Sequence, residues 1–83
     1  MDALDHEAAL VAEARGAIVR GDPQAALRAL HAARQLPSRQ LLPEELAVEA
    51  QAYRALGRDD DARDADTTLR KQFPESALAH HPE

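Results

Sequence analysis

Four histidines are the residues of this chain whose side chains most readily bind metal ions. His80 and His81 are adjacent, and adjacent helical residues point in different directions, so the two imidazoles do not converge. His6 and His31 lie far from them along the chain, and no cysteine is present to complete a set. The spacing therefore predicts no structural or catalytic metal site.

Five aspartates between residues 59 and 66 are the next candidate, as a calcium-binding loop. Such a loop needs a central glycine and a final glutamate, and this segment has neither. Ala62 and Arg63 also interrupt the carboxylates. Because acids are stabilised at a helix N-terminus, Asp59, Asp60 and Asp61 are predicted to open a helix instead.

Nucleophilic catalysis would depend on hydroxyl groups, and only Ser38, Ser76, Thr67 and Thr68 carry one suited to it. The chain has no Gly-x-Ser-x-Gly turn and no glycine-rich phosphate loop. So small a helical domain also has difficulty enclosing a substrate pocket. We therefore expect neither an enzyme nor a cofactor.

The charge balance also limits the partners. The net charge is −5, Lys71 is the one lysine, and the arginines are scattered among acids, so a nucleic-acid partner is not expected. No apolar run approaches the ~20 residues that span a bilayer, and the acidic N-terminus lacks the basic start of a secretion signal. We expect a soluble chain without direct membrane insertion. The compartment stays open: cytoplasmic by default, envelope-associated if the chain belongs to a longer exported protein.

Two glycines, Gly21 and Gly57, lie in matching surroundings. Each follows an alanine-rich apolar pattern and precedes acidic residues and a second alanine-rich pattern. Glycine closes a helix in a left-handed conformation, and aspartate just beyond it caps the next helix. The pattern predicts an all-α fold of four helices in two antiparallel helical hairpins. A spacing within ~20–50 residues is typical of helical repeats.

The expected helices follow from these start and stop signals. Asp2 or Asp5 caps the first, Asp22 and Pro23 start the second, and Pro37 and Pro74 close the two hairpins. One or both of Leu41 and Leu42 are expected to pack beneath the hairpins. At most one further helical turn is expected, from Ser76 to Ala79. The four helices are expected at about Ala3–Arg20, Pro23–Leu36, Pro43–Leu56 and Asp59–Phe73.

These residues resemble a pair of tetratricopeptide repeats, each built of two antiparallel helices. The second unit departs from the family pattern at Glu49, Asp66 and Leu69, and the first at Glu13 and Ala17. The resemblance implies an alpha-alpha superhelix and one domain over 1–83, with repeat one at about 4–37, a connector at 38–42, repeat two at about 43–74 and a tail at 75–83. The matching positions are Leu10, Ala14, Gly21, Ala26, Leu30 and Ala33 in the first unit and Leu46, Ala50, Tyr53, Gly57, Ala62 and Pro74 in the second.

The resemblance further implies a non-catalytic protein–protein interaction module, a scaffold or adaptor that binds a peptide or a partner domain. The expected surface is the face lined by the first helix of each repeat. The lysine and asparagine clamp for a peptide carboxylate, known in one subgroup, is absent, because its places carry Val11, Arg15, Ala47 and Gln51. The predicted partner-binding residues are Val11, Arg15, Ile18, Val19, Val48, Gln51 and Arg54.

An alternative is that the chain is a homo-oligomerisation module, since two repeats lack the neighbours that normally complete such an array. The apolar residues Val11, Ile18, Val19 and Val48 would then meet a second copy of the chain, as in a homodimer. A third interpretation is that they are simply intramolecular core. Segments around Gly57 and Pro74 are similar to repeats of bacterial envelope-associated and regulatory proteins, which implies a larger bacterial protein.

Overall fold

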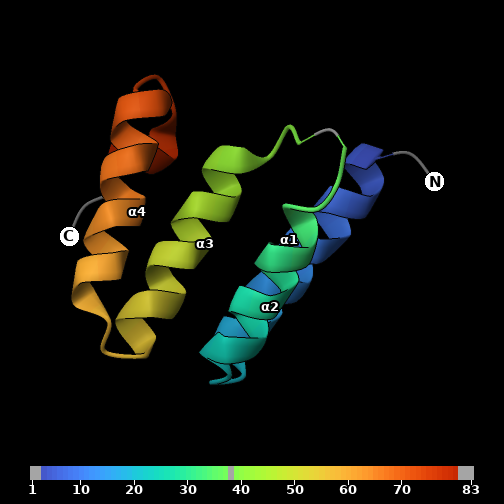
Figure 1. Cartoon of the computed structure of the whole chain (residues 1–83), viewed down its shortest axis with the longest axis horizontal. Helices are drawn as coiled ribbons and strands as arrows, with labels where there is room; N and C mark the ends of the chain where they lie inside the picture. The colour runs from blue at the N-terminus through green and yellow to red at the C-terminus, as the bar shows by residue number, and fades with distance from the viewer. Residues whose placement is uncertain (1–2, 38, 81–83) are drawn as a thin grey trace.

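The computed structural model describes residues 3–37 and 39–80. In this part of the chain there are four α-helices and no strand (Figure 1). Helix α1 packs against α2 and α3 against α4, which confirms the predicted all-α fold of two antiparallel hairpins. The elements are α1 (Ala3–Val19), α2 (Pro23–Ala33), α3 (Leu42–Ala55), α4 (Asp59–Gln72) and a short 3-10 helix, η1 (Ala77–His80).

Both hairpin turns depend on a glycine with a positive φ, 82° at Gly21 and 76° at Gly57. The backbone N–H of Asp22 donates to Ala17 at 2.8 Å, and that of Arg58 donates to Tyr53 at the same distance. In each turn the glycine N–H bonds three residues back. This paired pattern satisfies the last helical carbonyls and reverses the chain. The sequence-predicted turns are therefore confirmed at both glycines.

The helix bounds agree with the expected ones to within one residue except at the end of α2. Asp22 caps α2 as predicted, because its Oδ1 accepts the N–H of Ala25 at 3.1 Å. Helix α2 ends at Ala33, however, and not near Leu36. The next residues form tighter bonds of the i→i−3 kind, such as Gln35 to Ala32, in a turn that leads into the connector. The expected cap at Asp2 lies outside the described residues, and Asp5 lies within the first turn of α1.

The core is thin and rich in alanine, and it joins the two hairpins. One cluster combines residues of α1 and α2 with Val48 and Ala52 of α3, so the hairpins share apolar contacts. A second cluster of Leu46, Leu69 and Ala79 lies between α3, α4 and η1, with Leu42 packed against it as expected. Small side chains allow close helix packing in a slab of 36 × 30 × 18 Å. Little area is buried per alanine, so each larger apolar residue matters.

Candidate functional site

The structure divides the predicted partner-binding residues into buried and exposed groups. Val11 is 3% exposed and Val48 is 2% exposed. Ile18 is half-buried and packs against the apolar cluster that contains Val48. Val11 and Val48 are therefore closed to a partner, and the intramolecular-core interpretation describes them. Arg15, Gln51 and Val19 are exposed, with Val19 at 87% the one large exposed hydrophobic residue of the described part.

Arg54, the remaining predicted residue, forms an ion pair within the chain. Its Nη1 lies 2.9 Å from Oδ2 of Asp66 and so ties α3 to α4. Asp66 is buried, so this ion pair between helices is largely shielded from water on the Asp66 side. A hollow of about 430 Å³ beside this pair is lined mainly by charged side chains of α3 and α4.

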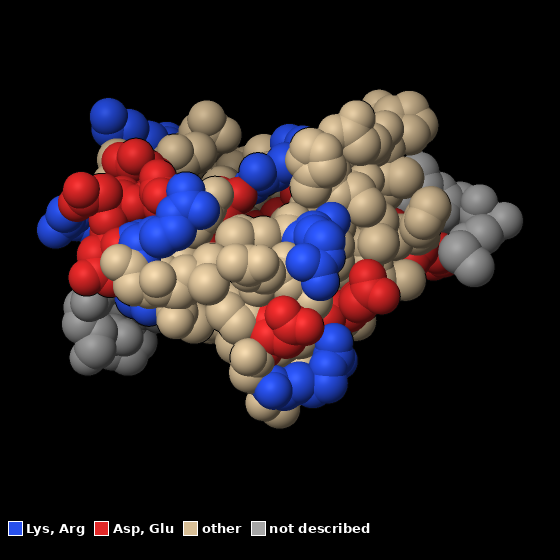
Figure 2. Space-filling view, turned by 60° about the horizontal axis from the view of Figure 1, so that its bottom comes forward, with Lys and Arg blue, Asp and Glu red and all other residues tan. Residues whose placement is uncertain are grey.

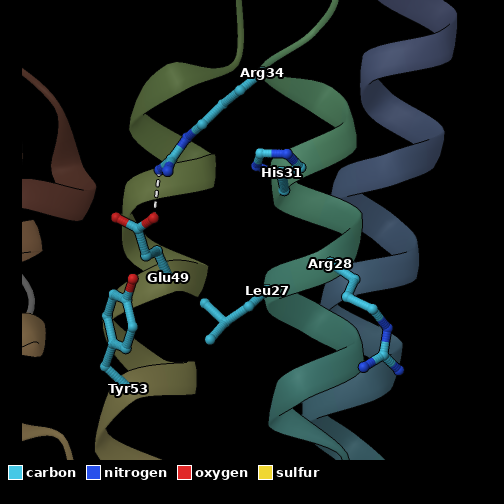
Figure 3. A pocket seen from close by; sticks show the side chains of 6 residues that line it. All are labelled: Leu27, Arg28, His31, Arg34, Glu49 and Tyr53. Atoms are coloured by element: carbon cyan, nitrogen blue, oxygen red, sulfur yellow. Dashed lines mark ion pairs between the residues drawn. The ribbon is translucent and has the colours of Figure 1, made fainter.

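A groove lies between α2 and α3, where the hairpins meet (Figure 3). Its volume is about 530 Å³. Leu27 points from α2 towards Tyr53 on α3, and both side chains are half-buried. These two residues supply the apolar part of the groove. Its lining residues are Leu27, Arg28, His31, Arg34, Glu49 and Tyr53.

An ion pair crosses one end of this groove. Arg34, at the end of α2, reaches over to Glu49 of α3, with 2.5 Å between Nη2 and Oε2 (Figure 3). His31 lies on α2 one turn before Arg34, whereas Arg28 extends away from α3. Glu49, like Asp66, is a buried acid that forms an ion pair between helices. The groove is thus closed at one end by charges and open elsewhere.

More basic than acidic side chains line the groove, although the chain as a whole is acidic. Acidic side chains gather at the end of the molecule formed by α4 (Figure 2), which carries Asp59, Asp60 and Asp61 in its first turn. Along the groove, by contrast, Glu49 is the one acidic lining residue, and Arg34 pairs with it. Arg28 has no carboxylate partner among the described residues. Next to Tyr53, the Arg58 guanidinium lies 4.9 Å from the ring centroid, a cation–π contact.

A second feature, which sequence reasoning missed, is a buried pair of carboxyl groups between the hairpins. Glu7 of α1 and Glu45 of α3 are both 0% exposed. The carboxylate of Glu7 accepts the backbone N–H of Gln40 at 2.7 Å and that of Leu41 at 3.0 Å. It thereby binds the connector where α3 begins. Glu45 lies in the first turn of α3, and its side chain turns inward.

The pKa values of the two carboxyl groups are shifted in opposite directions. Burial alone raises the pKa of Glu7, but the hydrogen bonds from Glu45, Gln40 and Leu41 lower it below its ordinary value. Burial, followed by the hydrogen bond and the negative charge of Glu7, raises the pKa of Glu45 to about 7. Arg34 Nε lies 4.0 Å from Glu45 Oε1 and only partly offsets this rise. The pair therefore holds one proton below about pH 7 and loses it as the pH rises through that value.

A signal for this pair does exist in the sequence. Glu7 precedes Val11 and Ala14 by four and seven residues, and Glu45 precedes Val48 and Ala52 by three and seven. Each glutamate thus lies on the apolar stripe of its helix. A charged residue on such a stripe is buried when the helix packs, and two of them on adjacent helices can meet.

The described serine and threonine side chains, which were the candidate nucleophiles, form hydrogen bonds with residues close to them in the sequence. Thr68 donates its hydroxyl to the carbonyl of Asp64, and Ser76 Oγ accepts the N–H of Leu78 at 3.2 Å. Thr67 accepts a long contact from Arg70, and Ser38 and His81 lie outside the described residues. Among the described residues, no group of three His, Asp or Glu side chains gathers to hold a metal ion. Nor is any helix in the ranges 3–37 and 39–80 long and apolar enough to cross a membrane.

The groove and the buried pair together can bind a ligand and hold a proton; they offer no arrangement of nucleophile and base. Comparisons of the chain with protein-family models, with curated proteins and with solved structures found no significant match.

Proposed function

We propose that the domain is a non-catalytic protein-interaction module that binds an acidic, extended peptide segment in the groove between α2 and α3. The observation that carries the proposal is the groove itself: about 530 Å³, with an apolar floor and cationic residues along it. Pockets that bind ligands combine apolar surface with a few polar groups that fix orientation. A scaffold or adaptor role of this kind is what the resemblance to tetratricopeptide repeats implies.

The apolar floor provides the affinity of such a contact. Leu27 and Tyr53 are half-buried, so part of each side chain still meets water in the free protein. One apolar side chain of a peptide laid between them would remove that surface from water, at roughly 25 cal/mol per Å². Aromatic residues are frequent anchors of binding sites, because they bury much area with little loss of side-chain freedom.

The charges provide the selectivity. Arg28 and His31 lie exposed on α2 beside the floor, with the Arg28 side chain directed away from α3, and the positive charge of Arg34 is shared with Glu49. A carboxylate of the peptide can pair with Arg28 and compete with Glu49 for Arg34, since arginine binds carboxylates in a forked geometry. A basic peptide would meet only Glu49, which is already paired. The preferred partner is therefore acidic.

The proposed surface differs from the first-helix face expected from the resemblance. That face requires Val11 and Val48, and both are buried. The groove instead uses the second helix of the first hairpin and the first helix of the second. Arg15 and Gln51 remain exposed on the original face and are suited as controls.

The test is a binding titration, followed by NMR, of the isotope-labelled chain with three synthetic octapeptides. All share one leucine and one tyrosine, and the remaining positions are acidic, uncharged or basic. The acidic peptide should shift the amide signals of Leu27, His31 and Tyr53 and bind most tightly. Charge reversal by Arg28→Glu should weaken binding by about three- to tenfold, while the matched Arg15→Glu change on α1 should not. If none of the peptides shifts the groove signals at millimolar concentration, the proposal is wrong.

The alternative of homo-oligomerisation is favoured by one observation, the 87% exposure of Val19. A second copy of the chain covering this residue would bury it. Light scattering behind size exclusion, over a tenfold concentration range, decides between the two. A mass near twice 9.0 kDa that falls on Val19→Asp substitution supports the dimer. A constant mass near 9.0 kDa leaves the groove as the interaction surface.

A further inference from the structure

The Glu7–Glu45 pair lies where the two hairpins are held together. Glu7 comes from α1, in the first hairpin, and Glu45 from α3, in the second. Through its two backbone hydrogen bonds, Glu7 also binds the connector at Gln40 and Leu41. Since both carboxyl groups are 0% exposed, water does not stabilise either charge. The pair therefore holds the two hairpins together at a site that is shielded from water.

The geometry shows which of the two carries the proton. Both oxygens of Glu7 accept N–H groups, which favours its charged form. Neither oxygen of Glu45 has an N–H or O–H donor among the described residues, and both are shielded from water. Two ionised carboxylates in contact cannot both be accommodated in such a place. A proton on Glu45 that points to Glu7 removes one charge and supplies the hydrogen bond.

We propose that this carboxyl pair is a proton-operated latch between the hairpins. While Glu45 holds its proton, the hydrogen bond to Glu7 keeps the start of α3 fixed to α1. When Glu45 loses this proton, two negative charges face one another in a site that is shielded from water. The junction then loosens, because water must enter or the carboxylates must separate. The inference stands apart from the proposed peptide binding, since it concerns the hairpin junction alone.

The surrounding charges change how readily Glu45 loses its proton, but Glu7 remains its hydrogen-bond partner. The charged groups that face Glu45 are Glu7 from α1, Arg34 from the end of α2, Arg39 from the connector and Glu49 one turn along α3. Arg34 is 4.0 Å away and is already bonded to Glu49, so it can neutralise an ionised Glu45 only by leaving that partner. From α4, the buried acid Asp66 faces Arg54 instead. The rise of the Glu45 pKa to about 7 places the transition near neutral pH.

The amides of Gln40 and Leu41 report directly on the latch. In the full chain, their hydrogen exchange is measured from pH 5.5 to 8.5 and corrected for the intrinsic rate. Carbon-13 NMR follows the side-chain carboxyl of Glu45 in the same samples. Protection of both amides should fall by about fivefold or more as Glu45 titrates. The amide of Arg58, bonded to Tyr53 in the distant turn, is the internal control and should not change.

Substitution completes the test. The E45Q protein keeps a neutral group that can donate to Glu7, so its Gln40 and Leu41 amides should stay protected at every pH. In the E7Q protein, Glu45 loses a negative neighbour and should titrate at lower pH. The proposal is overturned if the Glu45 carboxyl titrates wholly below pH 5, or if wild-type protection is constant across its titration. Retention of the full pH effect by E45Q overturns it equally. The wild-type titration decides the matter even where a variant fails to fold.

Discussion

Glu45 is the residue at which the pH dependence of this domain is concentrated. Its pKa in the folded chain is about 7, above the ordinary value of 4.5, so folding favours the protonated form. The stability that this gives is fully present below pH 4.5 and is lost as pH rises to about 7. Glu7 acts oppositely: its lowered pKa gives stability that is lost as pH falls through its folded value. The two contributions together are therefore greatest near the ordinary carboxyl value of 4.5.

The resulting prediction concerns the Glu45→Gln substitution. Wild-type free energy of unfolding should fall between pH 5 and pH 8 by up to about 3 kcal/mol, while that of E45Q should change little. At pH 8 the variant should be the more stable protein, because it buries no second charge. Urea denaturation of both proteins at the two pH values measures this difference. Parallel pH dependences of the two proteins would contradict the assignment of the proton to Glu45.

At the level of elements, Gly57 and Gly16 have different roles. Gly57 adopts a φ of 76°, and a Cβ there would meet no atom within 4 Å, so backbone strain alone opposes substitution. Gly57→Ala should cost about 1 kcal/mol. Gly16 lies inside α1, where a Cβ would meet only the mobile end of Arg20 at 3.3 Å. Gly16→Ala should therefore stabilise by about 0.5–1 kcal/mol. Thermal unfolding compares the two, and an equal effect of both would show that the φ argument is wrong.

The side-chain cap at the start of α2 should contribute measurably to stability. Asp22 accepts the N–H of Ala25, and Pro23 occupies the first helical position. Removal of the acceptor by Asp22→Ala should lower stability by about 1 kcal/mol, whereas Asp22→Asn should keep most of it. Chemical denaturation at pH 7 distinguishes them. Asp59→Ala is the matched control, since α4 starts without a side-chain cap and Asp59 contributes only to the helix dipole.

These elements also show how far sequence reasoning reaches. The hairpin turns were predictable because Gly21, Asp22 and Gly57 act through local backbone geometry. The end of α2 was predicted too late, because the early turn at Arg34 goes with an ion pair to Glu49 that only the folded chain reveals. The Glu7–Glu45 contact was missed although each glutamate lies on the apolar stripe of its helix, because the meeting of the two side chains depends on how separate helices pack. Val11 and Val48 fitted the predicted surface equally well but lie inside.

The whole molecule combines a net charge of −5 with a groove whose lining carries more positive than negative side chains. Its proposed acidic partner must therefore approach against the overall charge and be attracted only near the groove. Affinity for the acidic octapeptide should fall with added salt, because the local attraction is screened over ~8–10 Å. The distant acids are screened as well, so the net fall should be modest, within about tenfold between 50 and 300 mM salt. A rise in affinity would contradict local attraction.

The same peptide also tests whether latch and groove communicate, since Arg34 lies between them. When Glu45 ionises, Arg34 is drawn towards it and offers less charge to a bound carboxylate. Affinity should therefore fall between pH 6 and pH 8 in the wild-type chain. Isothermal titration calorimetry at the two pH values should show this fall, and the E45Q protein should lose most of it. If E45Q keeps the full pH dependence, the latch opens without changing the groove, and Arg34 remains with Glu49 at both pH values.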